Sequence, residues 1–369
     1  MKVLYLVNIP SPYRVDFFNE LSKYCDLTVL YECSHSLERN DSWASKGLKT
    51  YQKVFLKGIR TGVNHAFSFE IIKYIKRFQN DVIVIGGYST PTAMVAIAYM
   101  KLHKMKYYIN ADGGQIANDT KFRYKLKKML IGNAAGYLST GRQTDDYFAH
   151  YGANRANIYR YPFTSLLQKD VLQRPLHRDE KYLLREQLGL PKAPKIVIAV
   201  GRFIQGKGFD ILLDIWEQSY IEHKLLLVGD GPLKTEYESR GVRNVMIIDF
   251  QKKEMLAKYY QASDVFVLPT RKDIWGLVIN EAMANGLPVI STDKCVAAVE
   301  LIEAHKNGAV VPSDDIEQLK QAIVAMLSAD DAALYQIGVH NISKIQQWYT
   351  IEKMAQTTAQ IFKEGYAGQ

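Results

Sequence analysis

The chain has 369 residues, of which 47% are hydrophobic and 23% are charged, and its formal net charge is +9. A chain of this length can bury two substantial cores, so two domains are expected. It has no run of 18 or more apolar residues, which excludes a single spanning helix, and its three scattered cysteines (Cys25, Cys33 and Cys295) exclude a disulfide framework.

The N-terminus is predicted to begin directly with a buried strand. Met1 and Lys2 lead straight into the apolar residues 3–7, a run that is too short for a signal peptide and has no small-residue cleavage site behind it. Together with the reduced-thiol inventory, this predicts a cytoplasmic protein.

Strands alternate with helices along the first half of the chain. Strands are expected near residues 2–8, 27–31, 81–85, 106–110 and 136–139, and helices over 13–24, 68–78 and 91–103. This alternation predicts a parallel sheet with helices on both faces.

A polar, charge-rich segment interrupts the alternation and contains Pro175, Pro191 and Pro194. We therefore expect four parts: a first Rossmann-like domain over residues 1–165, a linker over 166–194, a second Rossmann-like domain over 195–346, and a C-terminal helical segment over 347–369. The helical pattern in the last part extends from about residue 347 to residue 363.

Charge is divided unevenly between the two halves. Residues 1–189 carry 28 Lys and Arg against 16 Asp and Glu, a net charge of +12, whereas the remainder carries 19 against 22, a net charge of −3. Nucleic acid is nevertheless not expected as a partner, because the chain has no helix-turn-helix, zinc or RNP signature.

Segment 121–130 in the basic half is predicted to form an amphipathic helix. Its apolar residues recur at helical spacing, and its cations lie mostly elsewhere around the helix; the apolar positions are Phe122, Leu126, Met129 and Leu130. Two interpretations stay open: an interfacial helix attracted to anionic lipid, or an ordinary helix whose apolar stripe meets the sheet.

Apolar strands in the second half end in loops that carry polar and glycine residues. Residues 196–200 lead into Gly201-Arg202-Phe203-Ile204-Gln205-Gly206-Lys207-Gly208, residues 225–228 into Gly229-Asp230-Gly231-Pro232, and residues 245–248 into Asp249-Phe250-Gln251-Lys252. The second loop fits both a site border and a tight turn that requires glycine.

The most informative segment starts at Asp273, after the apolar run 265–268. Two carboxylates lie on either side of a helix N-terminus expected near Gly276: Asp273 in the loop before it and Glu281 inside the helix. Its first amides, at Gly276, Leu277 and Val278, have no intrahelical partner and can face a phosphate, while the carboxylates can accept hydrogen bonds from vicinal hydroxyls. On spacing alone, Asp273 as a helix cap and Glu281 as a solvated residue remain the alternative.

The string around these acids resembles the E-x7-E region of the retaining glycosyltransferases of family 4, which have the GT-B fold. The matching residues are Pro269, Gly276, Glu281-Ala282-Met283-Ala284, Gly286 and Pro288-Val289-Ile290, and the upstream Gly-Arg and Lys-Gly pairs match as well. One departure is plain: the first acid is usually Glu, and here it is the shorter Asp273. The resemblance implies an α/β protein with two Rossmann-like α/β/α domains that face each other across a cleft and a last helix that crosses back onto the first domain.

The resemblance also implies roles for residues of the second domain. Arg202 and Lys207 would stabilise the departing diphosphate, Glu281 would hold the ribose, and Asp273 the sugar. The other expected donor-binding residues are Gly201, Gly229, Gly231, Phe250, Trp275, Gly276, Leu277 and Val278. No metal site or cofactor is expected, since the chain has no D-x-D and no histidine ligand spacing.

Two loops of the first domain receive candidate roles from the same resemblance. Tyr13 and Arg14 replace the glycine pair that many family members have beside the donor phosphates, so Arg14 either touches a phosphate or is a surface residue at a helix start. Asp112 stands where the family often has a histidine, so it either contacts the sugar or the acceptor or is a turn residue before two glycines.

The sequence therefore predicts a retaining glycosyltransferase that uses a nucleotide-diphosphate sugar, with UDP favoured, to extend a bacterial surface polysaccharide. The acceptor would be a saccharide or a polyprenyl-linked saccharide, and the protein would lie in the cytoplasm at the inner face of the cell membrane. A GT-B nucleotide-sugar epimerase and a non-catalytic nucleotide-binding protein are the alternatives.

Overall fold

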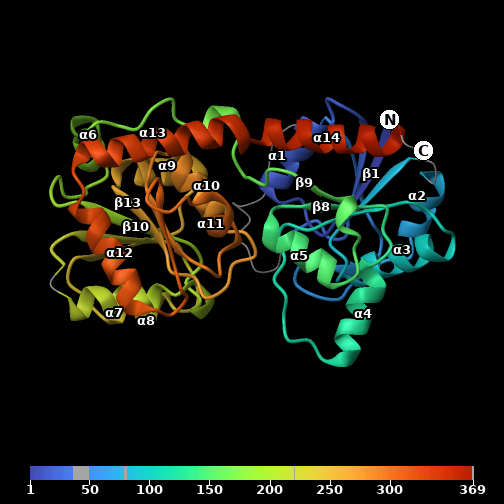
Figure 1. Ribbon diagram of the computed structural model, residues 1–369, viewed down its shortest axis with the longest axis horizontal. Coiled ribbons are helices and arrows are strands. Elements are labelled where there is room, and N and C mark those ends of the chain that lie inside the picture. The colour runs from blue at the N-terminus through green and yellow to red at the C-terminus, as the bar shows by residue number, and fades with distance from the viewer. Residues whose placement is uncertain (36–49, 79–80, 220, 368–369) are drawn as a thin grey trace. The chain divides into compact units, whose positions relative to one another are not determined.

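The computed structural model describes residues 1–35, 50–78, 81–219 and 221–367. Contacts within the chain divide it into two compact units (Figure 1). Unit 1 comprises Met1–Leu167 and Thr350–Gln369, and unit 2 comprises Gln168–Tyr349. Each unit is built on a parallel sheet with helices packed against it, so the predicted α/β fold class is confirmed.

Unit 1 contains a seven-stranded sheet of order β3-β2-β1-β6-β7-β8-β9 and a small two-stranded sheet, β4-β5. Its strands are β1 (Lys2–Val7), β2 (Asp26–Tyr31), β3 (Gln52–Phe55), β4 (Ile59–Arg60), β5 (Ala66–Phe67), β6 (Val82–Gly86), β7 (Tyr108–Asn110), β8 (Gly136–Ser139) and β9 (Ile158–Arg160). Its helices are α1 (Pro12–Leu21), α2 (Ile71–Arg77), α3 (Pro91–Leu102), α4 (Lys121–Ile131), α5 (Arg142–His150) and α14 (Ile351–Ala367).

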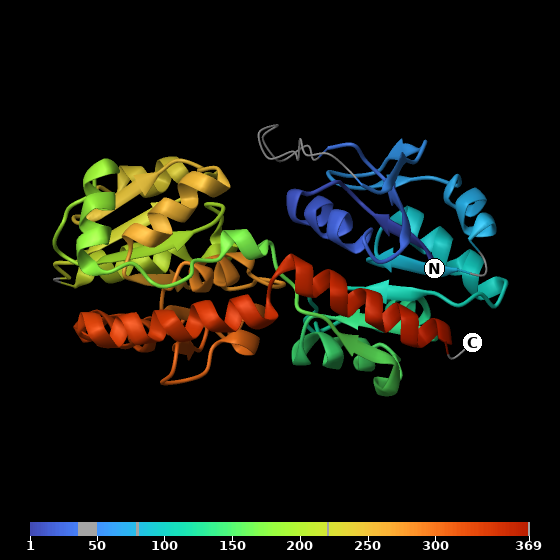
Figure 2. The same cartoon turned by 90° about the horizontal axis from the view of Figure 1, so that it is seen from above.

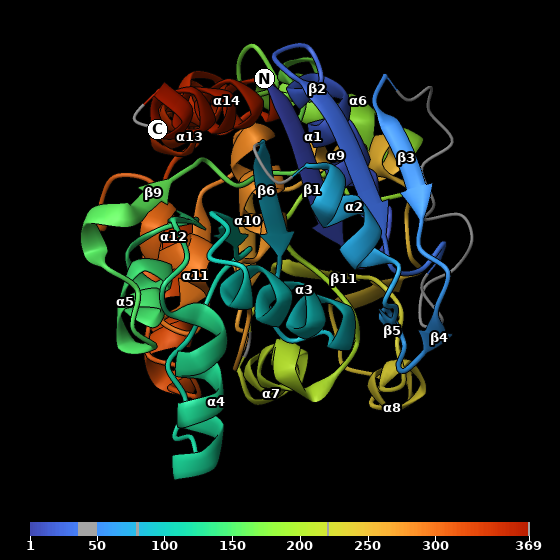
Figure 3. The ribbon, with the colours of Figure 1, turned by 90° about the vertical axis from the view of Figure 1, so that its right-hand side faces the viewer.

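The central strands of this sheet are apolar along their length because helices cover both faces. Residues 3–7 of β1 are all buried, and β1 pairs in parallel with β2 on one side and β6 on the other. Figure 3 shows β3, β2, β1 and β6 side by side, with α2 and α3 in front of them.

The C-terminal helix α14 belongs to unit 1 although it follows the whole of unit 2 in the sequence. It packs against α1, and the ring of its Phe362 lies 5.5 Å from that of Tyr108 in β7. Figure 2 shows α14 alongside unit 1 up to the C-terminus. The prediction that the last helix crosses back to the first domain is confirmed, and the helix begins at Ile351, after α13 has ended at Trp348.

Unit 2 contains a six-stranded parallel sheet of order β12-β11-β10-β13-β14-β15. Its strands are β10 (Ile196–Val200), β11 (Lys224–Val228), β12 (Val245–Ile248), β13 (Val265–Leu268), β14 (Val289–Thr292) and β15 (Gly308–Val311). Its helices are α6 (Arg178–Gln187), α7 (Phe209–Gln218), α8 (Lys234–Ser239), α9 (Lys253–Ala262), α10 (Leu277–Ala284), α11 (Val296–Leu301), α12 (Ile316–Ser328) and α13 (Asp331–Trp348).

The strand order of unit 2 reverses direction between β10 and β13. The first three strands in sequence run outward to one edge of the sheet, and the next three run outward to the other. In open parallel sheets the loops at such a switch point diverge and leave room for a ligand at the carboxyl ends of the strands. The loops after β10 and β13 are therefore the first place to look for a site.

Residues 168–194, most of the segment expected as a linker, pack as part of unit 2. Helix α6 lies within this segment, and its Arg185 donates to the Ala262 carbonyl oxygen at 2.8 Å and to Asp264 Oδ2 at 2.6 Å. The Asp264 carboxylate also accepts from the Ile196 amide at 2.7 Å. These bonds hold α6 against β10 and against the loop that leads into β13.

The described residues include no single helix with the length and apolar character needed to cross a membrane. Helix α12 and residues 331–365, which hold α13 and most of α14, form one bent pair that is long and apolar enough only when its two parts are taken together.

Candidate functional site

The loop after β10 folds back onto the sheet of unit 2 in a short 3-10 turn, η4 (Gln205–Lys207). Gly208 ends this turn with φ 71° and precedes α7. A Cβ at Gly208 would lie 2.1 Å from the Pro269 carbonyl oxygen, so only glycine lets this loop approach the end of β13 so closely. The approach brings Lys207 next to the second loop.

The loop after β13 leads into helix α10. Gly276 is the residue before the helix and has φ 96°, and a Cβ there would lie 2.5 Å from Cys295 Sγ. The amides of Leu277 and Val278 occupy the first turn, where helix geometry leaves them without an intrahelical acceptor. Both residues are half-buried, so this helix start has the geometry of an anion site.

Lys207 and Asp273 meet where the two loops come together. The Lys207 ammonium donates to Asp273 Oδ2, and the two side chains are 20% and 15% exposed. The sequence assigned one of these residues to the diphosphate and the other to the sugar. They bind each other, so a ligand anion would have to compete with Asp273 for the lysine.

Glu281 lies further along α10 and is half-buried. The hydroxyl of Tyr260, at the end of α9, lies 3.3 Å from Glu281 Oε2 and donates to it. Burial first, and then the negative charge of Glu281, raises the pKa of Tyr260 well above its ordinary value, so the phenol stays protonated as a donor. Tyr260 thus fixes one carboxylate oxygen, a role that the sequence did not suggest.

Trp275, one of the expected donor-binding residues, is buried at 3% exposure. Its indole N–H donates to Asn280 Oδ1 at 2.9 Å, and its carbonyl oxygen accepts from the Ala297 amide at 2.8 Å. The buried Trp275 side chain therefore packs under the first turns of α10 and is bonded to Asn280 in that helix.

Gly229 and Gly231 follow β11 and lie against the loop after β10. A Cβ at Gly229 would lie 1.9 Å from the Gly201 carbonyl oxygen, and one at Gly231 would lie 2.6 Å from that of Phe203. Both glycines are thus required for close packing of two loops. Phe250, after β12, is 48% exposed and remains the one aromatic ring among the expected donor residues that faces solvent.

In unit 1, the side chain of Arg14 points inward. It is 6% exposed, and its Nη2 donates to Asn110 Oδ1 at 2.9 Å and to Asp112 Oδ1. Burial alone would lower the pKa of Arg14, but Asp112 together with Tyr161, Tyr5 and Tyr13 outweighs it, and the pKa lies well above its ordinary value. A phosphate contact of Arg14 would require the guanidinium to give up these bonds, and the alternative expectation of a surface arginine is wrong, because the side chain is buried. Within the described residues, its Nη1 has no hydrogen-bond partner.

The carboxylate of Asp112 is held from two sides. Arg14 binds Oδ1, and the hydroxyl of Tyr13 lies 3.5 Å from Oδ2. The loop after β7 therefore presents a fixed, one-third exposed carboxylate at a carboxyl end of the sheet of unit 1. The sequence named Tyr13, Arg14 and Asp112 separately, and the structure joins them into one cluster.

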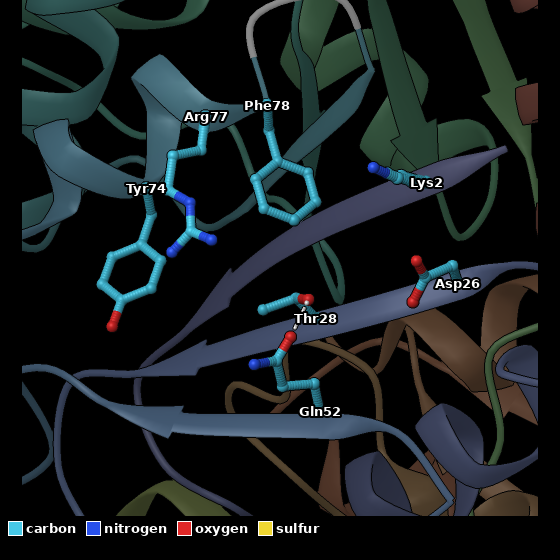
Figure 4. Close-up of a pocket in the computed structure, with 7 residues that line it drawn as sticks. All are labelled: Lys2, Asp26, Thr28, Gln52, Tyr74, Arg77 and Phe78. Atoms are coloured by element: carbon cyan, nitrogen blue, oxygen red, sulfur yellow. Dashed lines mark hydrogen bonds between the residues drawn. The ribbon is translucent and has the colours of Figure 1, made fainter.

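Unit 1 also contains a cavity of about 200 Å³ at the opposite edge of its sheet. Figure 4 shows the side chains that line it, from α2 and from the amino-terminal parts of three strands: Lys2, Asp26, Thr28, Gln52, Tyr74, Arg77 and Phe78. Thr28 donates to Gln52 across its floor at 3.1 Å. Because ligands of parallel sheets bind at the carboxyl ends of the strands, this cavity is not the candidate site.

Metal ligands were not expected from the sequence. The described residues contain no group of three or more His, Cys, Asp or Glu side chains placed to hold a metal ion. Metal independence stays a prediction.

Most of unit 2 is similar in sequence to a known protein family. Residues 194–329 match the family model described as glycosyl transferases group 1. The resemblance to this family is confirmed. The assignment to its retaining family 4 is finer than the match and remains a prediction.

Curated relatives and solved structures agree with the match. A putative teichuronic acid biosynthesis glycosyltransferase, TuaC of Bacillus subtilis, is 29% identical over 244 residues, which are 65% of this chain and 60% of that protein. The chain spans about half the length of the curated relatives it matches, 49%, 46% and 51% in three of them.

Among solved structures, sucrose-phosphate synthase from Thermosynechococcus elongatus superposes with a TM-score of 0.78 at 19% identity over all of both chains. HepE of Anabaena, solved with UDP and glucose, superposes with a TM-score of 0.75 at 16% identity over 99% of this chain and all of that one. At these identities the likeness shows the fold, and the fold is that of the GT-B glycosyltransferases.

Proposed function

We propose that this protein is a retaining glycosyltransferase that transfers a sugar from a nucleoside-diphosphate sugar to a glycan or lipid-linked saccharide. The observation that carries the proposal is the Lys207–Asp273 pair at the switch point of unit 2, beside the start of α10. Three groups meet there: the Lys207 cation, which can bind a diphosphate, the Asp273 carboxylate, which can bind sugar hydroxyls, and a helix N-terminus, which can bind phosphate. They lie within a domain that matches group 1 glycosyltransferases.

Each donor group has a candidate partner in unit 2. We assign the diphosphate to Arg202, Lys207 and the first amides of α10, the ribose to Glu281 and the sugar to Asp273. Phe250 would lie against the base, and Gly201, Gly229 and Gly231 would border the donor. UDP is the favoured nucleotide, and HepE, a structural neighbour, was solved with UDP and glucose.

In the proposed reaction, the bond between the anomeric carbon and the diphosphate oxygen breaks as the bond to the acceptor oxygen forms on the same face. The acceptor proton passes to the departing diphosphate, so no enzymic nucleophile is needed and the configuration is retained. Negative charge grows on the diphosphate in the transition state, and Arg202 and Lys207 would stabilise it without a metal ion.

We assign Asp112 of unit 1 to a hydroxyl of the acceptor or of the transferred sugar. Arg14 and Tyr13 would act through it, since both contact its carboxylate. The net charge of +12 over residues 1–189 favours an acceptor that carries phosphate, such as a polyprenyl-linked saccharide. TuaC is named for teichuronic acid biosynthesis, which supports a role in a bacterial surface polysaccharide.

Transfer activity of three variants tests this proposal. Arg202→Ala, Lys207→Ala and Glu281→Ala should each lower the rate of transfer from the donor by about 100-fold, because each removes a group that stabilises or orients the diphosphate sugar. Lys306→Ala serves as a control, since Lys306 is exposed and pairs with Glu303. Full activity of the three site variants, in proteins with unchanged melting temperature, would refute the assignment.

Product analysis separates the remaining alternatives. A nucleotide-sugar epimerase would give an isomerised donor without any acceptor, and a non-catalytic nucleotide-binding protein would release no nucleotide from any donor. The proposed transferase releases the nucleoside diphosphate and forms a glycoside only when membrane extract supplies an acceptor.

We further propose that helix α4 contacts an anionic membrane surface. The structure splits the expected stripe: Leu130 is buried and Leu126 packs on the core, whereas Phe122 and Met129 are 76% and 58% exposed. The helix projects from unit 1 in Figure 1 and carries exposed cations; these are Lys121, Arg123, Lys125 and Lys128. Exposed apolar side chains among cations favour the interface of an anionic bilayer.

Vesicle binding tests the membrane contact. Changing Phe122 and Met129 together to Ser should weaken binding to phosphatidylglycerol vesicles at least about tenfold, because two large apolar side chains no longer enter the bilayer. Phe69→Ser is the matched control, since Phe69 is 64% exposed on unit 1 outside α4. Equal binding of the double variant and the control would contradict the contact.

A further inference from the structure

The two loops that meet in the candidate site of unit 2 are tied together by more than the Lys207–Asp273 pair. The carbonyl oxygen of Gly206, in the turn before Lys207, accepts three hydrogen bonds from the loop after β13. The donors are Thr270 Oγ1 at 2.8 Å, the Arg271 amide at 2.9 Å and the Lys272 amide at 3.3 Å. The position of the lysine loop is thus set by the loop that carries Asp273.

Arg271 extends this connection with its side chain. Nη1 and Nη2 bind the two oxygens of Asp210, at the start of α7, at 2.8 Å and 2.7 Å. Nη1 also donates to the Gln205 carbonyl oxygen at 2.8 Å, and Nε donates to Asp314 Oδ1 at 2.6 Å. One guanidinium therefore joins the turn before Lys207, the first turn of α7 and the loop after β15.

We propose that Arg271 is a positioning residue that holds the Lys207 turn and the Asp273 loop in one geometry for binding the diphosphate. It lies two residues before Asp273 and binds the residue two before Lys207, so it constrains both charged groups while its own guanidinium is occupied by Asp210 and Asp314. The planar fork is needed because a lysine cannot bind Asp210 through two parallel hydrogen bonds and reach Gln205 and Asp314 as well. This role rests on the proposed function.

Arg240 provides a matched control within the same unit. Like Arg271, it binds two carboxylates, and both of these lie on α7: Asp214, at 2.8 Å, and Glu217. The side chains of Arg240 and Arg271 are 22% and 27% exposed. Arg240 directly follows α8, and its two carboxylate partners lie outside the Lys207 and Asp273 loops. Its removal therefore reports what the loss of a surface arginine does to unit 2 in general.

Calorimetric titration of UDP into the full chain tests the proposal, with melting temperatures measured on the same samples. Arg271→Gln should raise the Kd for UDP about tenfold, as loss of a residue that orients a binding group commonly does. Arg271→Lys should restore the melting temperature toward that of the wild type more fully than it restores the Kd for UDP, because lysine keeps a positive charge beside Asp210 but lacks the planar guanidinium. Arg240→Gln should lower the melting temperature by a similar amount and leave the Kd within about twofold.

Two results would overturn the role of Arg271: an unchanged Kd in Arg271→Gln, or an equal rise in Arg240→Gln, which would assign the effect to stability alone. Failure of the proposed function looks different. In that case the wild-type chain itself binds neither UDP nor GDP, and Arg271 has no diphosphate site to position.

Discussion

At the scale of single residues, the candidate site of unit 2 holds its two key charges in contact. Lys207 donates to Asp273, and neither side chain is fully buried. A diphosphate that takes the lysine would release the carboxylate, which then becomes available to sugar hydroxyls. The resembling family usually has the longer Glu at this position. The Lys207–Asp273 contact is therefore made here by a shorter acid, and changing Asp273 tests what the contact does.

Asp273→Asn should therefore bind UDP more tightly and yet transfer sugar more slowly. The variant no longer competes with the diphosphate for Lys207, and a partly exposed ion pair contributes up to about 1 kcal/mol, so the Kd for UDP should fall about two- to fivefold. Turnover of the complete donor should drop, since the sugar loses its charged acceptor. Calorimetry with UDP and a transfer assay measure the two effects.

Asp293→Asn controls for a general change in charge. Asp293 directly follows β14 and binds Lys294 at 2.9 Å, so the variant removes one carboxylate from the same unit but leaves the Lys207–Asp273 contact in place. It should leave the Kd for UDP within about twofold. Weaker UDP binding in Asp273→Asn would show that the carboxylate supports the nucleotide directly and would contradict competition.

Residues that a motif names were predictable, and contacts between distant residues were not. Lys207 lies between Gly206 and Gly208, and Asp273 lies between Pro269 and Gly276, in strings that match a known family pattern, so their roles could be inferred. The Arg14–Asp112 bond joins residues 98 positions apart, and nothing local signals it. Arg271 likewise looks like an ordinary loop arginine until its partners on three other segments are seen.

At the scale of elements, the most buried strands were the easiest to predict. Strands β10 and β13 are apolar throughout because both faces are covered, and their expected bounds agree with the structure. Strand β3 was not predicted, because it is an edge strand with exposed polar residues. Strands β4, β5 and β9 were not predicted either, because two or three residues are too few to show a hydrophobic alternation. A strand has a clear hydrophobic pattern only where it is buried, so edge strands are hard to predict from the sequence.

Helix α6 shows how an expected linker can be ordered by one buried charge cluster. Burial alone would raise the pKa of Asp264, but Lys181 and Arg185 outweigh it, and the pKa falls below its ordinary value of 3.8. A carboxyl whose pKa is lowered in the folded state contributes stability above its unfolded pKa, about 3.9, and loses that contribution as the pH falls through the folded pKa. The cluster should therefore weaken below about pH 4.

Asp264→Asn should lower the free energy of unfolding at pH 7 by about 3 to 5 kcal/mol, because Arg185, whose side chain is 3% exposed, loses its charged partner. The difference from the wild type should shrink as the pH falls below about 4 and through the lowered pKa of the folded carboxyl, since the wild-type carboxyl then becomes protonated. Urea unfolding at the two pH values measures both effects. Asp331→Asn, which breaks the exposed Arg178–Asp331 pair of the same helix, should cost less than about 1 kcal/mol, and an equal cost would contradict the assignment.

At the scale of the whole molecule, each unit has a parallel sheet whose order reverses once, and the candidate residues of each unit follow the carboxyl ends of its strands. The alternation of strands and helices was enough to predict this architecture. The sequence did not predict that residues 168–194 pack with unit 2, because proline and charge are typical of linkers, whereas the buried contacts of Arg185 depend on the folded sheet.

The central claim, that unit 2 holds a nucleoside diphosphate with Lys207, is tested most directly by calorimetric titration of UDP into wild-type protein and into Lys207→Ala. We expect saturable one-site binding by the wild type and a Kd at least about tenfold higher in the variant, at equal melting temperature. The absence of binding of both UDP and GDP to the wild type, or equal UDP affinity in the two proteins, would contradict it.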